Sequence, residues 1–111
     1  MIEGDKKKFK KTLKTATIYD NIIPVNAYVS QYFEDENCLD RILMRAQFPE
    51  NFDLLSIDID SFDYQIWESI SIFKPKVVII EISLAKTIKD KYAIHDGNST
   101  IDGSSFMSVY N

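Results

Sequence analysis

Apolar and polar residues follow one another along this chain in blocks that match strands and helices. Residues 54–59 and 76–82 form two runs rich in Leu, Ile and Val, typical of buried strands in a parallel sheet. Between them, apolar residues recur every three or four positions and predict a helix over 64–73. Weaker patterns predict the tail of a strand at 1–2, a helix over 6–16, a strand over 22–29 and a short helix over 38–46. Because strands alternate with helices, we expect an α/β fold with a mostly parallel sheet and flanking helices.

Several residues refine this outline. Pro24 has no backbone N–H, so the strand 22–29 is expected at a sheet edge or to begin there. Asp40 and Arg41 are expected to face water on their short helix. Loop signals occupy 96–99 and 102–105, and 106–110 looks like the start of a helix. Since the chain opens on a strand's last residues and closes on a helix's first ones, we expect residues 1–111 to be one partial domain.

Acidic residues stand where the two clearest strands end. Asp58 and Asp60 close the first run, and Glu81 closes the second. An unpaired charge cannot share the burial of an apolar strand, so these side chains should lie where the strands leave the sheet. Ligands of open parallel sheets bind at the carboxyl ends of the strands. Asp58 and Asp60 also point the same way while strand geometry lasts, so they mark a candidate site.

The same acids have simpler uses. Asp60, Ser61 or Asp63 could cap the helix that follows, because their side chains accept hydrogen bonds from unpaired N–H groups. Asp58 and Asp60 could share a divalent cation. Two carboxylates without a third ligand make a poor site, so no metal is predicted. Glu81 could instead pair with a lysine such as Lys86.

Composition narrows the class of protein. The chain has 111 residues, 45% of them hydrophobic, and a formal net charge of -4, which argues against a nucleic-acid partner. The basic run at 6–11 is interpreted as a solvated helix face, with Phe9 and Leu13 pointing inward. The single cysteine, Cys38, excludes an internal disulfide and is expected in the core, as is Trp67. No apolar stretch could span a bilayer and no signal peptide is evident, so a cytoplasmic protein without a membrane partner is expected.

Three connected segments resemble the FkbM-like branch of class I S-adenosylmethionine-dependent methyltransferases. Residues 52–60 and 74–81 resemble its fourth and fifth strands, and 63–68 the helix between them. Residues 2–9 look like the end of the second strand with the helix after it. The glycine-containing segment 96–106 resembles the loop before a later helix. The resemblance implies a Rossmann-like sheet and methyl transfer to an oxygen of a small molecule or sugar.

The resemblance also implies residue roles. Glu3 would bind the ribose hydroxyls of S-adenosylmethionine, and Asn26, Ala27 and Tyr28 would lie near the adenine. Asp58 and Asp60 would be the catalytic pair between methyl donor and acceptor, with Asp58 as base or orienting group. Asp63 and Glu81 would face the substrate.

Two departures from the family pattern matter. Ser61 stands where the family usually has glycine, and a Cβ there could forbid a positive φ. The first strand and its glycine-rich loop are missing, since the only glycines are Gly4, Gly97 and Gly103. That strand is central in the family sheet, so the remaining strands must pair directly or stay apart. We therefore expect this fragment alone to bind S-adenosylmethionine weakly or not at all, and to be inactive.

Two other functions stay open. Asp58-Ile59-Asp60 could be the D-x-D of a nucleotide-sugar glycosyltransferase, whose acids hold a metal on the diphosphate. Alternatively, the chain is a non-catalytic α/β module whose exposed sheet edges bind another chain or a second copy of itself.

Overall fold

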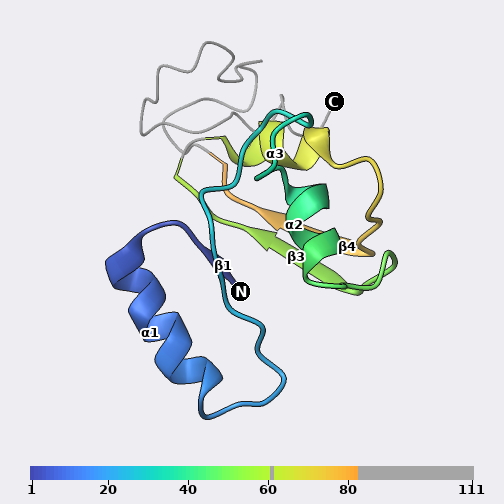
Figure 1. The fold of residues 1–111 in the computed structure, drawn as a ribbon. Coiled ribbons are helices and arrows are strands. Elements are labelled where there is room, and N and C mark those ends of the chain that lie inside the picture. The colour runs from blue at the N-terminus through green and yellow to red at the C-terminus, as the bar shows by residue number, and fades with distance from the viewer. Residues whose placement is uncertain (61, 83–111) are drawn as a thin grey trace.

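The computed structural model describes residues 1–60 and 62–82. Within them the chain forms, in order, β1 (Ile2–Glu3), α1 (Lys6–Ala16), β2 (Val25–Asn26), α2 (Leu39–Arg45), β3 (Leu54–Ile57), α3 (Asp63–Ser69) and β4 (Val77–Ile80). Figure 1 shows α2 and α3 beside the β3–β4 pair and α1 apart from them. The predicted α/β class is confirmed. The loops and helix expected after residue 83 lie outside the described residues.

The described strands form two separate parallel pairs. β1 pairs with β2, with Ile2 opposite Val25, and β3 pairs with β4, with Ile57 opposite Ile80. Both pairings are parallel, as the alternation of strands and helices predicts. No strand ladder joins β1 to β3 in the part of the chain that the structure describes.

Helix α1 begins at a strong cap and matches the predicted range. The Asp5 carboxylate accepts hydrogen bonds from the backbone N–H groups of Lys7 and Lys8, both at 2.8 Å. This occupies donors that the first helical turn otherwise leaves unpaired. The lysines of the helix face solvent, as predicted. Leu13 does not point inward, because its side chain is 43% exposed while Thr12 is buried.

The core lies where α2 and α3 cover β3. Leu39, Ile57 and Ile66 form its buried centre, one residue from each of these elements. Cys38 is buried at the start of α2, and Trp67 packs against the cluster from α3. Both predicted core residues are therefore confirmed.

The Asp40 carboxylate explains why α3 is shorter than its apolar spacing predicts. The helix ends at Ser69, four residues before the predicted end, and Ile70 has an extended backbone. The next turn wraps around Asp40, which accepts hydrogen bonds from the N–H and Oγ of Ser71, both at 2.9 Å, and from the N–H of Ile72 at 3.2 Å. Asp40 is only 6% exposed, so the expectation that it faces water was wrong. Asp40 can be buried because hydrogen bonds from the polar groups of this turn replace its hydration.

We expect Asp40→Ala to lower the free energy of unfolding by about 3 kcal/mol. The substitution leaves several buried hydrogen-bond donors of the turn after α3 without an acceptor. Asp53→Ala is the matched control. Asp53 also bonds a partner, Lys76 at 2.6 Å, but its side chain is 87% exposed. Its removal should therefore cost less than about 1 kcal/mol. Urea denaturation of both variants measures the difference, and equal losses would contradict the structural role of Asp40.

Candidate functional site

The carboxyl end of the β1–β2 pair gathers residues predicted to bind the cofactor. The Asn26 side-chain amide donates to the carbonyl oxygens of Glu3 (2.7 Å) and Gly4 (3.1 Å). Glu3 Oε1 accepts from the N–H of Asp5 at 2.8 Å. Asn26 therefore holds the turn between β1 and α1, and the Glu3 oxygen left for a ligand is Oε2.

Tyr28 lies over this turn. Its ring is so close to Gly4 that a Cβ placed there would be 2.3 Å from Cδ1. Any side chain at position 4 would thus displace the ring. Tyr28 remains 73% exposed, so it offers an aromatic surface beside Glu3. Ala27, between Asn26 and Tyr28, is half-buried.

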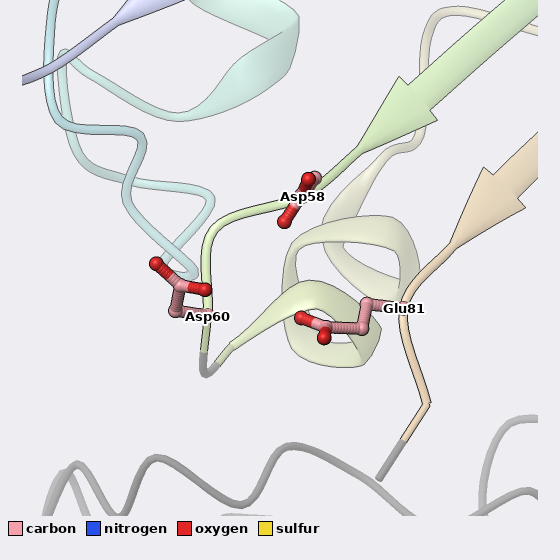
Figure 2. Close-up of side chains that lie close together, drawn as sticks. All are labelled: Asp58, Asp60 and Glu81. Carbon is pink, nitrogen blue, oxygen red and sulfur yellow. The ribbon is translucent and has the colours of Figure 1, made fainter. Parts of the chain in front are cut away.

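The carboxyl end of the β3–β4 pair gathers three carboxylates, which we call the acidic cluster: Asp58, Asp60 and Glu81. Each residue offers one carboxylate oxygen that lies within 4.8 Å of the other two. Figure 2 shows Asp58 directly after β3, Asp60 on the turn that follows, and Glu81 directly after β4. Because Ile57 and Ile80 are paired, Asp58 and Glu81 leave adjacent strands at the same level. The strand register thus places a third carboxylate, that of Glu81, beside Asp58 and Asp60, a grouping that the sequence did not predict.

The turn after β3 determines where Asp60 lies. β3 ends at Ile57, so strand alternation does not extend to Asp60, which has a φ of 67°. Aspartate is among the few residues that adopt this left-handed region with little strain. A positive φ thus occurs at Asp60, while Ser61, the position at which glycine was expected, lies outside the described residues.

Asp63 forms a hydrogen bond with the turn that follows β3. Its side chain is 2% exposed, and its Oδ1 accepts a hydrogen bond from the N–H of Ile59 at 3.1 Å. The N-cap of α3 is Phe62, so neither Asp60 nor Asp63 occupies the cap position that was one of their possible uses, and Ser61 lies outside the described residues. Asp63 occupies the first helical turn and ties it to the end of β3. Asp63 thus holds the backbone at the end of β3, next to Asp58 and Asp60, and its place on the substrate side stays a prediction.

The acidic cluster changes the titration of Glu81. Loss of hydration, followed by the negative charges of Asp58, Asp63 and Asp60, raises the pKa of the Glu81 carboxyl above its ordinary value. The side chain is nevertheless exposed, so a ligand can reach it. A carboxyl with a raised pKa accepts a proton more readily near neutral pH than an ordinary one. Three hard oxygen ligands at this spacing could also hold a divalent cation.

An apolar cavity of 460 Å³, here called the central groove, separates the two strand pairs. Ile2 of β1 lines one side, Leu54 to Ile57 line the other, and Leu39 and Ile42 of α2 lie between. Asp58 also lines the groove, so its side chain connects this cavity with the acidic cluster.

Comparison with family models, curated proteins and solved structures finds no match to this chain. None of the helices in residues 1–60 and 62–82 is both long and apolar enough to cross a membrane.

We expect Glu81→Gln to stabilise the protein at neutral pH. Since the folded state raises this pKa, it holds a proton that the unfolded chain has released, so stability falls as pH rises through the folded pKa. Glutamine removes that loss. The gain should vanish below the ordinary glutamate pKa of about 4.3, where both states are protonated. Thermal unfolding from acid to neutral pH measures this, with Glu50→Gln, an exposed acid before β3, as control. A gain that does not depend on pH would contradict the repulsion.

Proposed function

We propose that this chain supplies the adenosine-binding and acceptor-binding strands of a Rossmann-like, S-adenosylmethionine-dependent methyltransferase domain. The supporting observation is the grouping of polar residues at the carboxyl ends of two parallel strand pairs. Glu3, Asn26 and Tyr28 gather after β1 and β2, and the acidic cluster gathers after β3 and β4. Both groups occupy the edge at which open parallel sheets bind ligands.

The first group suits an adenosine. Glu3 Oε2 can accept hydrogen bonds from vicinal ribose hydroxyls, because only Oε1 is engaged by the backbone. The exposed ring of Tyr28 offers a flat surface on which an adenine can stack. Asn26 acts indirectly, since its amide is committed to the β1–α1 turn.

The acidic cluster suits the methyl acceptor. When bound, S-adenosylmethionine supplies a methyl group carried on a positively charged sulfur. Glu81, with its raised pKa, would take the proton from an acceptor hydroxyl as the hydroxyl oxygen bonds to the methyl carbon; the carbon–sulfur bond would break and its electron pair would neutralise the sulfur. Asp58 and Asp60 orient that hydroxyl and favour the positive charge nearby. The sequence favoured Asp58 as the base, whereas the electrostatics favour Glu81. The substrate class we propose is a small molecule or sugar with a free hydroxyl.

The central groove explains why this chain alone should bind the cofactor poorly. The two polar groups belong to strand pairs that no ladder connects within residues 1–60 and 62–82, so no backbone hydrogen bonds between strands fix their spacing there. Binding must then include the cost of fixing both pairs in one geometry.

Titration with S-adenosylhomocysteine tests this proposal. In ¹H–¹⁵N spectra, millimolar ligand should shift the amides of residues 3–4, 26–28 and 58–60, without saturating in the micromolar range. Glu3→Gln should abolish the shifts at residues 3–4 and 26–28, whereas Glu50→Gln should leave them unchanged. The absence of shifts at millimolar ligand would overturn the adenosine site. Saturation at micromolar ligand would show that the chain does not lack part of its cofactor site.

The acidic cluster also supports a second candidate, a metal-dependent nucleotide-sugar glycosyltransferase. Glu81 adds a third carboxylate to Asp58 and Asp60, and such a cluster can hold the cation that bridges a diphosphate. If this is correct, Mn²⁺ together with a uridine diphosphate sugar should raise the melting temperature more than either alone. Glu81→Gln should remove the effect, and Glu50→Gln should retain it. Stabilisation by the nucleotide sugar without metal, or none at all, would exclude this candidate.

A further inference from the structure

We infer that the central groove binds an extended apolar peptide strand, which pairs with β1 on one side and with β3 on the other. The peptide runs parallel to β3 and carries a basic residue at its carboxyl end. This inference does not rest on the proposed methyl transfer, because it uses the backbone edges and the lining of the groove.

The register of β3 shows which of its backbone groups face the groove. Val77 N–H donates to the carbonyl of Asp53 at 2.9 Å, with Val77 opposite Leu54. In a parallel ladder, alternate residues turn both N–H and C=O toward the same neighbour. Asp53, Leu55 and Ile57 therefore face β4, and Leu54 and Ser56 direct their N–H and C=O groups to the opposite edge. Leu54 and Ser56 both line the groove.

The same reasoning applies to β1. Val25 N–H donates to the carbonyl of Met1 at 2.9 Å, with Val25 opposite Ile2. Met1 and Glu3 therefore face β2, and the N–H and C=O of Ile2 point away from it. Ile2 lines the groove from the side opposite β3. The groove thus lies between the edges of β1 and β3, which are not paired with each other in the described residues. An extended peptide backbone can form hydrogen bonds with both edges at once.

The lining selects an apolar strand. Leu39 and Ile42 of α2, with Val29, Phe52 and Ile66, contribute apolar side chains to the groove. A strand that enters between two parallel strands is covered by such side chains, and strands in that position are rich in Val and Ile. A polar peptide would lose hydration there without replacing it.

Charge complementarity determines which residue ends the bound peptide and in which direction the peptide runs. Asp58 lines the carboxyl end of the groove, and the oxygens of Asp60 and Glu81 lie within 4.8 Å of its carboxylate oxygen. A parallel strand brings its carboxyl end to this acidic cluster, where a lysine relieves the repulsion among the three acids. An acidic end group would add to that repulsion.

The test uses a fluorescein-labelled peptide, Val-Ile-Val-Ile-Val-Gly-Lys, and fluorescence anisotropy. We expect saturable binding, together with slower hydrogen exchange at the amides of Ile2, Leu54 and Ser56. N-methylation of alternate peptide amides should weaken binding by about tenfold or more, because it removes the backbone donors but keeps the side chains. The reversed sequence, with lysine first, should also bind more weakly.

Exchanging the charges of the peptide end and of Asp58 tests which end of the groove holds the carboxyl end of the peptide. A peptide ending in Glu should bind poorly to the natural chain and regain affinity with Asp58→Lys. The matched control is Asp53→Lys, which places the same charge at the opposite end of β3, where the side chain is exposed. Asp53→Lys should not restore binding of the Glu peptide.

Several results would overturn the inference. They are equal binding of the N-methylated and unmodified peptides, protection of amides at β4 without protection at Leu54 and Ser56, and no binding of the lysine peptide. A dimer formed by the chain alone, whose interface protects the same three amides, would assign the groove to a second copy.

Discussion

The parallel register of β3 and β4 is the constraint on which the candidate site depends. With Ile57 opposite Ile80, the next residues of both strands leave the sheet together, and both are acids. Asp58 and Glu81 are therefore neighbours although 22 residues separate them in sequence. A shift of one position would turn one side chain to the other face of the sheet and break the acidic cluster. The apolar core under β3 fixes this register, because Ile57 is buried between α2 and α3.

Two buried acids show how the fold supports the exposed ones. Asp40 is surrounded by donors from the turn after α3, and Asp63 binds the backbone at the end of β3. Together they fix both ends of α3, the helix that links β3 to β4. The positions of Asp58, Asp60 and Glu81 thus depend on two buried carboxylates outside the acidic cluster. Loss of hydration, and then the charges of Asp58, Asp63 and Asp60, raise the pKa of Glu81, and this framework holds those charges beside it.

The separation of the two strand pairs connects the proposed function with the proposed peptide site. In each pair one strand, β1 or β3, turns the edge that its partner does not occupy toward the central groove. A strand in that groove would supply hydrogen bonds to both edges and fix the spacing between the group around Glu3 and the acidic cluster. The lack of a ladder between β1 and β3 in the described residues would account both for the apolar cavity and for the weak cofactor binding that we expect.

The sequence alone determined the class of fold and most of its elements, because spacing and capping are local properties. Helix α1 has its predicted bounds since Asp5 caps it, and β3 and β4 follow from their apolar runs. The acids at the strand ends were equally predictable, because an unpaired charge cannot stay in a buried strand. The length of α3 was not, since it depends on Asp40, a residue from another helix.

Only the tertiary structure decided which acids act together. Local pattern assigned Asp40 to solvent, but it is buried by a turn 31 residues away, and Asp63, assigned to a cap or a substrate, is buried with a hydrogen bond to Ile59. The positive φ at Asp60 and the partnership of Asp58 with Glu81 depend on a turn and a register that involve two strands. The sequence therefore determined where carboxylates leave the sheet. Their gathering into one cluster, and the groove beside it, result from long-range pairing that no local pattern encodes.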